Sequence, residues 1–525
     1  MSTETLPERT GMCAWCEHEN APDSRFCGDC GRTLVFDVVC PFCGRENPSE
    51  NAHCDACAVL IDESKRVMPK TKIFPKYLNV TAMTLAAIIV FALSIRLFSL
   101  TDIPLNLVGD EADNLLNVYR IMAGIGPGFF ELDWKPQPAF SVYMMGWFMG
   151  FFGETIVGMR LPSVVLSTVS ILVFYAVARQ HGVGRPASLG ATFLLATGVW
   201  YLHFSRSGWE NVHVGLYALS TMLAFNAAIK TKRLTISLLL FAATGLFAAL
   251  GLYGYTTGRM IIVALLVYLP IAFFLHRDDW KRLLAGYGVM CLTAFLLFWP
   301  QLDNALDDWQ RFNQRVDAVY VLNDHNRQQF EGKDDLEIIV QQTWNNIRGF
   351  ILLDTGISRV GLNARYIPPG HGLLDRLTAV LFWVGLVVSV TRWRQTILWW
   401  LFFIVMIFPV QIPGSGTPDA ARAVGTAPLY YLFVALTLDW LFSLRFAKNQ
   451  WAIGAVAVTV LALIAYVNVS GYFDWMERPD AAAARQPAVD AADFESWQTL
   501  QKAAAEAGRG GFNVGEWLEM KERGF

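Results

Sequence analysis

Eleven apolar segments follow one another along the chain, and short polar loops separate them. Each segment is about 20 residues long, the length that an α-helix needs to cross the hydrocarbon core of a bilayer. The segments cover residues 77–99, 161–178, 186–203, 212–229, 235–254, 259–276, 283–300, 373–391, 395–411, 424–442 and 451–471. The pattern predicts a polytopic α-helical membrane protein with about 11 spans.

A further apolar run, residues 139–152, is shorter than a span and is typical of an interfacial or re-entrant helix. If this run does not cross, the short basic loops between the later spans lie on the same side as the basic stretch 65–76. Basic loops mark the cytoplasmic side of a membrane. We therefore expect a cytoplasmic N-terminus, an external C-terminus, and interfacial helices in the first external loop, residues 100–160.

This topology divides the chain into four parts. They are a cytosolic head at 1–60, a basic linker at 61–76, a membrane domain at 77–471 and an external tail at 472–525. The first span is expected to serve as the signal anchor, because no basic stretch followed by an apolar run precedes it. A second long external loop, residues 301–372, is expected to gate the entry of substrates, since polar loops of this length are usually functional.

Composition agrees with a membrane protein and excludes two classes of function. Hydrophobic residues make up 54% of the chain and charged residues 17%, against about 25% charged residues in soluble proteins. The net charge is −3 and the basic residues are scattered, so no nucleic-acid partner is expected. The predicted spans hold almost no charged residues, which argues against an ion-coupled transporter.

Eight cysteines in the head form two copies of one pattern. Two CxxC pairs separated by ten residues recur 27 positions later, at Cys13, Cys16, Cys27, Cys30, Cys40, Cys43, Cys54 and Cys57. Four thiolates in tetrahedral geometry select zinc, so the pattern predicts two structural zinc ions and a reducing, cytosolic location. The alternative is a disulfide framework, which requires an oxidising compartment. The head resembles the double zinc ribbons that are appended to many prokaryotic proteins.

Three carboxylates, Asp110, Glu111 and Asp113, lie in the first external loop directly after the first span. Acids beside a membrane carry a desolvation cost and usually mark a functional site. The alternative is structural: Asp110 could cap a helix that begins near Glu111. Both interpretations can hold together.

Further motifs follow in a fixed order. Lys135-Pro136 precedes the short apolar run, Arg160-Leu161-Pro162-Ser163 opens the next span, and Tyr253-Gly254-Tyr255 is followed by Arg259. Together with Asp110-Glu111, these motifs resemble the C-superfamily glycosyltransferases, especially relatives of the protein O-mannosyltransferases and of the aminoarabinose transferase of lipid A. The resemblance covers residues 77–300, with Gln137 where the family usually has a second proline.

The resemblance implies that a polyprenyl-phosphate-linked sugar is the donor and that it is transferred on the external face, with inversion, to a lipid, glycan or protein. Asp110 would be the general base and Glu111 would orient its surroundings or contact the sugar. The donor phosphate would be bound by cationic side chains, namely Lys135, Arg259, Arg160, Arg206 and Arg422. Weaker substrate-binding candidates are Glu210, Tyr255, Arg365 and Tyr366. The sequence offers no convincing ligand set for a catalytic metal.

Each assignment has an alternative. Lys135 and Arg160 could simply flank the membrane, and His203 and His213 could be satisfied by local partners. For the whole chain, the alternatives to a glycosyltransferase of the cell membrane are a polyprenyl-lipid flippase or transporter, and a membrane scaffold or sensor that acts through its zinc ribbons. The expected partners are the donor and membrane lipids, with a cytosolic protein as a further candidate for the zinc ribbons.

Overall fold

The computed structural model describes most of the membrane domain and a few residues of the head. The described residues are 18–20, 29, 38–39, 46–47, 80–133, 136–351, 364–443, 450–485, 488–489, 493–509, 511, 516–517 and 519–520. The chain divides into two units, Met1–Leu78 and Asn79–Phe525. In the first unit, strands β1 (Val38–Val39) and β2 (Glu46–Asn47) pair antiparallel. The eight zinc-ligand candidates lie outside the described residues.

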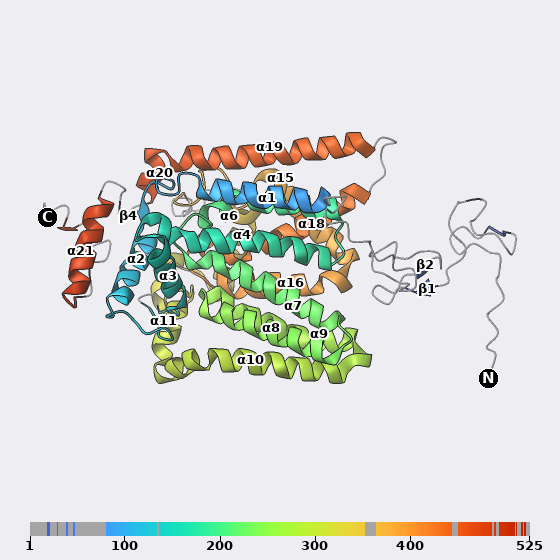
Figure 1. The fold of residues 1–525 in the computed structure, drawn as a ribbon, viewed down its shortest axis with the longest axis horizontal. Coiled ribbons are helices and arrows are strands. Elements are labelled where there is room, and N and C mark those ends of the chain that lie inside the picture. The colour runs from blue at the N-terminus through green and yellow to red at the C-terminus, as the bar shows by residue number, and fades with distance from the viewer. Residues whose placement is uncertain are drawn as a thin grey trace, which may run out of the picture. The chain divides into compact units, whose positions relative to one another are not determined.

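The second unit is a bundle of long helices that run side by side (Figure 1). Its membrane helices are α1 (Val80–Leu97), α4 (Ile156–Gln180), α5 (Arg185–Thr197), α6 (Val199–Phe204), α7 (His213–Lys230), α8 (Leu234–Tyr253), α9 (Arg259–Leu275), α10 (Trp280–Asp307), α15 (Arg376–Thr391), α16 (Trp393–Gln411), α18 (Ala427–Ser443) and α19 (Gln450–Met476). Shorter elements are α2 (Gly109–Met122), α3 (Phe140–Phe152), α11 (Trp309–Val319), α12 (Asp324–Arg327), α13 (Asp335–Ile351), α17 (Ala420–Ala423), α20 (Pro479–Ala484) and α21 (Phe494–Glu506).

The predicted class, a polytopic α-helical membrane protein, is confirmed. Within the described part of the chain, nine helices are long and apolar enough to cross a membrane. The other two predicted spans are helical but shorter: 373–391 contains α15, and 186–203 is divided into α5 and α6 at Gly198. A Cβ at Gly198 would lie 2.1 Å from the hydroxyl of Tyr431, so the break is a place where two elements approach closely.

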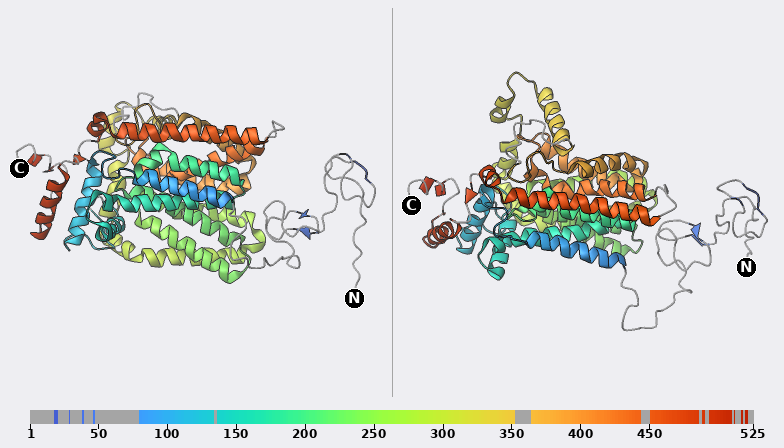
Figure 2. Two further views of the ribbon diagram at one scale, coloured as in Figure 1. Left: turned by 45° about the horizontal axis from the view of Figure 1, so that its top comes forward. Right: turned by 90° about the horizontal axis from the view of Figure 1, so that it is seen from above.

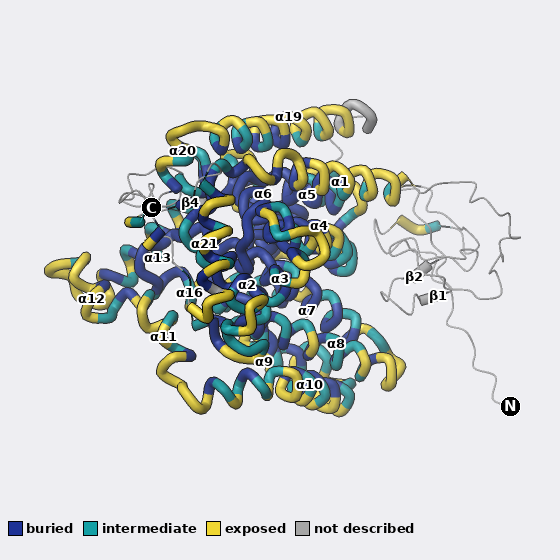
Figure 3. The backbone as a smooth tube through the Cα atoms, turned by 60° about the vertical axis from the view of Figure 1, so that its left-hand side comes forward, coloured by how far each residue is buried: buried dark blue, intermediate teal, exposed yellow. Residues whose placement is uncertain are grey.

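Burial separates the centre of the bundle from its lipid-facing rim (Figure 3). Helices α7 and α18 are buried over most of their length, whereas α1 and α19 expose most of theirs. Small residues allow neighbouring helices to pack closely, since a Cβ at Gly245 of α8 would lie 2.4 Å from the carbonyl oxygen of Met290 in α10. Exposed apolar side chains such as Val456 on α19 fit contact with lipid tails.

One end of the bundle is covered by the first loop and the C-terminal tail together. Helices α2, α3, α20 and α21 gather there (Figure 1). Strand β3 (Leu107–Val108) pairs antiparallel with β4 (Ala488–Val489), with Leu107 opposite Val489. Leu115 of α2 and Trp497 of α21 share one buried apolar cluster. Helix α3, the short apolar run, packs between α2 and α4, and α11 to α13 project from the bundle (Figure 2).

Candidate functional site

The acidic motif forms the first turn of α2. The helix begins at Gly109, and Val108 occupies the N-cap position in an extended conformation without a side-chain cap. Asp110 therefore lies inside the first turn and is not the N-cap residue that the structural alternative required. Both Asp110 and Glu111 lie in the first turn, at the positive end of the helix dipole, where negatively charged side chains stabilise a helix. Asp110 is partly exposed, whereas Glu111 is completely buried.

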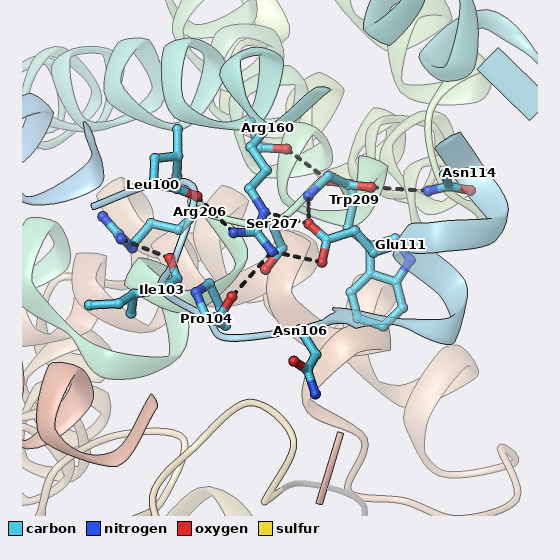
Figure 4. A network of polar contacts seen from close by, with 12 residues as sticks. Leu100, Ile103, Pro104, Asn106, Glu111, Asn114, Arg160, Arg206, Ser207 and Trp209 are labelled. Atoms are coloured by element: carbon cyan, nitrogen blue, oxygen red, sulfur yellow. Dashed lines mark hydrogen bonds and ion pairs between the residues drawn. The ribbon is translucent and has the colours of Figure 1, made fainter. Parts of the chain in front are cut away.

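Glu111 is the centre of a buried network of polar contacts (Figure 4). Arg160, at the start of α4, donates from Nε to Oε1 of Glu111 over 2.8 Å and from Nη2 to Oε2 over 3.2 Å. The backbone N–H of Gly208 donates to Oε1 over 2.7 Å. Nη2 of Arg485 lies 3.6 Å from Oε2. A buried carboxylate needs such paired charges and hydrogen-bond donors, because its desolvation is otherwise too costly.

Three buried arginines bind the backbone that leads from α1 into the acidic motif. Arg206 donates to the carbonyls of Arg96 over 2.8 Å and of Ile103 over 2.9 Å. Arg160 donates to the carbonyl of Leu100 over 2.8 Å, and Arg485 to that of Asn106 over 2.7 Å. The end of a helix leaves carbonyls without intrahelical partners, and Arg206 satisfies that of Arg96 at the end of α1. The other contacts bind carbonyls of the loop that follows the helix.

The burial and contacts of Arg160 and Arg206 change the interpretation of these two predicted phosphate ligands. Arg160 and Arg206 are 1% and 0% exposed, and their guanidinium groups are engaged with protein oxygens. Their geometry favours a role in positioning the loop over direct contact with a lipid phosphate. Glu210, a weaker substrate-binding candidate, is also buried and accepts a hydrogen bond from Nδ2 of Asn114 over 3.0 Å. Lys135 lies outside the described residues.

Tyr366 connects the acidic motif with a second acid, Asp419. Burial raises the pKa of Tyr366, and the negative charges of Asp419 and Asp110 raise it further. Both acids therefore lie within electrostatic reach of the Tyr366 hydroxyl. Asp419 caps α17 and pairs with Arg422, whose Nε lies 3.3 Å from Oδ2 of Asp419. Arg365, beside Tyr366, donates to the carbonyl of Ala484 in the tail over 3.2 Å.

A cavity of about 280 Å³ opens beside Arg422. Its charged lining, as far as the described residues define it, consists of arginines: Arg259 from α9, Arg315 from α11 and Arg422 from α17. Tyr255 and Tyr320 add hydroxyl groups, and Met260, Val316, Pro409 and Val410 add apolar surface. The guanidinium carbon of Arg259 lies 3.9 Å from the centre of the Phe312 ring, which holds the side chain in place.

The cavity unites three predicted residues, Tyr255, Arg259 and Arg422, that lie far apart in the sequence. Sequence reasoning missed Arg315 and Asp419. The signal for Arg315 was its place in the polar loop 301–372, where gating was expected. Asp419 shares its loop with Arg422 but carries no motif. Arg485 was also missed, because no motif marks it within the tail.

Comparison with known families confirms the resemblance that the sequence motifs indicate. Residues 136–302 match the family model for dolichyl-phosphate-mannose-protein mannosyltransferase. Residues 13–58 match the double zinc ribbon. The first match begins directly after Lys135 and includes Arg160, Arg206, Tyr255 and Arg259.

Among curated proteins, the chain is similar to the undecaprenyl phosphate-alpha-4-amino-4-deoxy-L-arabinose arabinosyl transferase of Pseudomonas aeruginosa. The two are 28% identical over 179 residues, which are 33% of this chain and 31% of the relative. The match thus spans about a third of the relative's length. The equivalent protein of Pseudomonas paraeruginosa is 27% identical over 179 residues, again 31% of its length.

Two solved structures are also similar over most of the chain. The apo oligosaccharyltransferase of Archaeoglobus fulgidus is 15% identical, with a TM-score of 0.49, over 79% of this chain and 57% of that one. ArnT from Cupriavidus metallidurans, solved with undecaprenyl phosphate bound, is 15% identical, with a TM-score of 0.48, over 84% of this chain and 76% of that one.

Proposed function

We propose that this chain, which carries the membrane domain of a C-superfamily glycosyltransferase, transfers a sugar from a polyprenyl-phosphate-linked donor to a lipid, glycan or protein acceptor. The observation that carries this proposal is the adjacency of an acidic and a basic region. Asp419 pairs with Arg422 of the arginine-lined cavity, and both Asp419 and Asp110 lie within electrostatic reach of Tyr366. A carboxylate beside a cationic pocket is what glycosyl transfer from a phosphate donor requires.

The cavity suits the phosphate of an amphiphilic donor. Arg259, Arg315 and Arg422 supply positive charge, and the guanidinium fork matches phosphate oxygens in geometry. The apolar lining from α9 and α16, such as Met260 and Val410, fits the first units of a prenyl chain. The name of the Pseudomonas relatives includes undecaprenyl phosphate, which supports a donor of this class. The sugar is a pentose or a hexose.

Asp110 is the proposed general base. It is partly exposed at the start of α2, where an acceptor hydroxyl can reach it. As the acceptor oxygen bonds to the anomeric carbon, its proton passes to the Asp110 carboxylate. The bond from the anomeric carbon to the phosphate oxygen breaks, and the phosphate leaves with the electron pair and is stabilised by the arginines. Attack opposite the leaving group inverts the anomeric configuration.

The residues around Glu111 position this base. Glu111 follows Asp110 directly and is fixed by Arg160 and Gly208. Because Arg160 and Arg206 also bind the carbonyls of residues 95–104, the loop before α2 is held from several sides. Lys135 remains a proposed phosphate ligand, next to the family-matched segment.

We place the transfer on the external face of the cell membrane, with the N-terminus in the cytoplasm. This proposal is supported by the basic loops and by the zinc-ribbon match at residues 13–58. The eight head cysteines would hold two structural zinc ions, and the head would bind a cytosolic protein. Four thiolates fill a tetrahedral site, so the head takes no part in the chemistry.

The test is mass spectrometry of membrane lipids from cells that carry the wild-type chain or Asp110→Ala. Accumulation of a polyprenyl-phosphate monosaccharide in the variant supports the proposal, and its mass identifies the sugar class. Asp113→Ala, three residues further along the same helix, is the matched control. It is expected to leave the amount of polyprenyl-phosphate sugar at the wild-type level. If the purified wild-type chain moves the sugar lipid across the membrane of proteoliposomes without forming any transfer product, the chain is a flippase instead.

A further inference from the structure

Arg485 is a buried basic residue in the C-terminal tail, whereas the described basic residues near it are partly exposed. Arg485, directly after α20, is 0% exposed, whereas Arg478 in the same segment is 52% exposed and Lys502 in α21 is 44% exposed. A buried guanidinium is costly unless it is paired and hydrogen-bonded. Burial lowers the pKa of Arg485 to about 10, and the charge of Glu111 opposes this effect. The side chain therefore carries its charge at neutral pH.

Each polar contact of Arg485 joins the tail to a segment of the proposed site. Its Nε and Nη2 donate to the carbonyl of Asn106 over 3.3 and 2.7 Å, across 379 residues of sequence. Its Nη1 donates to the carbonyl of Arg365 over 2.9 Å, next to Tyr366. The same Nη2 lies 3.6 Å from Oε2 of Glu111. One guanidinium thus contacts two segments of the chain, the one that leads into Asp110 and the one that contains Tyr366.

The tail is anchored on both sides of Arg485. On one side, α20 follows the membrane helix α19 after a short turn. On the other side, β4 pairs with β3, and Gln498 of α21 donates to the hydroxyl of Tyr119 in α2 over 2.7 Å. The tail thus contacts both the segment that precedes α2 and the C-terminal half of α2, the helix that carries Asp110 in its first turn.

We propose that Arg485 is a positioning residue of the active site, through which the C-terminal tail sets the place of Asp110. It acts through Glu111 and the carbonyl of Asn106, and it does not line the arginine cavity. The inference rests on the proposed function only for its kinetic consequence. Its structural consequence, an ordered segment from residue 98 to residue 114, is independent of any activity.

The experiment compares the purified wild-type chain with Arg485→Gln, Arg485→Lys and the matched control Arg478→Gln. In Arg485→Gln, kcat falls by about 100-fold, because a displacement near 1 Å at a reacting group has such an effect. The KM for the donor stays close to the wild-type value. Arg485→Lys keeps the charge and recovers part of kcat, while Arg478→Gln behaves as wild type. A KM that rises in proportion as kcat falls would overturn the positioning role.

Amide hydrogen exchange over residues 98–114 provides the second measurement. Exchange in this segment rises in Arg485→Gln and stays at the wild-type rate in Arg478→Gln. Wild-type kcat together with wild-type exchange in Arg485→Gln would overturn the inference. If Arg485→Gln does not fold, the inference is tested with Arg485→Lys. Values of kcat and of the exchange rate between those of wild type and a full loss support the inference, and wild-type values for both overturn it. A wild-type chain that transfers no sugar contradicts the proposed function, whereas the exchange result still decides whether Arg485 orders the loop.

Discussion

Arg160 donates to Glu111 over 2.8 Å in an ion pair whose side chains are 1% and 0% exposed. The pair joins the first turn of α2 to the first turns of the membrane helix α4. It places a fixed charge pair one residue away from Asp110, so the two neighbouring acids have different tasks. Glu111 holds the loop in place, and Asp110 remains partly exposed for chemistry.

This difference predicts that substitution of Glu111 lowers stability, whereas substitution of Asp110 lowers activity. Glu111→Gln leaves the Arg160 guanidinium buried without its counter-charge and is expected to lower stability by about 3–5 kcal/mol. Fluorescence-detected size-exclusion chromatography of heated samples measures this loss of stability. Asp474→Asn, which breaks the exposed pair of Asp474 with Arg478, is the control and leaves the melting curve in place. Unchanged melting of Glu111→Gln would contradict the structural role.

Asp110→Asn is expected to reduce transfer by about 100- to 10,000-fold, the range for loss of a general base. The melting curve should stay at the wild-type position, because the side chain is partly exposed and the amide keeps its shape. Product formation from a synthetic polyprenyl-phosphate sugar by the purified enzyme is the measurement. Asp113→Asn serves as the control on the same helix, and equal loss in both variants would argue against a specific base at Asp110.

Substitution of the cavity arginines should weaken donor binding. Arg315→Gln removes one charge-assisted hydrogen bond, worth about 1.5–3 kcal/mol, so affinity for a polyprenyl phosphate falls by about 10- to 100-fold. Arg311→Gln, on the exposed side of the same helix α11, is the matched control. Binding of a fluorescent polyprenyl phosphate in detergent measures both. Equal affinities for the two variants would exclude the cavity as the phosphate site.

The head is expected to bind about two zinc ions per chain, because four thiolates close one tetrahedral site. Elemental analysis of the purified chain counts the ions, and Cys13→Ser combined with Cys16→Ser should remove one of them. Transfer by the purified enzyme is expected to continue after residues 1–60 are deleted. Loss of transfer on deletion, with an intact melting curve for the membrane domain, would give the head a role beyond binding a partner.

The proposed orientation predicts which loops a membrane-impermeant thiol reagent reaches in intact cells. Glu331→Cys, exposed between α12 and α13, should react. Lys232→Cys, between α7 and α8, has a side chain that is 78% exposed in the wild type, yet it should react only after the membrane is opened. The reverse pattern would place the acidic motif in the cytoplasm and exclude a donor on the external face.

Features that follow from a local rule could be predicted from the sequence alone. A bilayer requires apolar helices of a certain length, so the predicted spans lie on helices, and only 186–203 and 373–391 are shorter than expected. The zinc ribbon and the family could be predicted in the same way, because CxxC pairs and short motifs are contiguous. Asp110 at the start of a helix also followed from its local pattern, although the helix begins earlier than the capping interpretation required.

Which charged side chains contact one another could be seen only in the folded chain. A basic residue at the end of a span can bind a lipid phosphate or the carbonyls of a neighbouring helix, and the residue type is the same in both cases. Arg160 and Arg206 bind carbonyls of residues 95–104, whereas Arg259 and Arg422 line a cavity with Arg315. Arg485 reaches Asn106 across 379 residues. Such pairings depend on how distant helices pack, because packing alone fixes which buried carbonyls and carboxylates still need a donor.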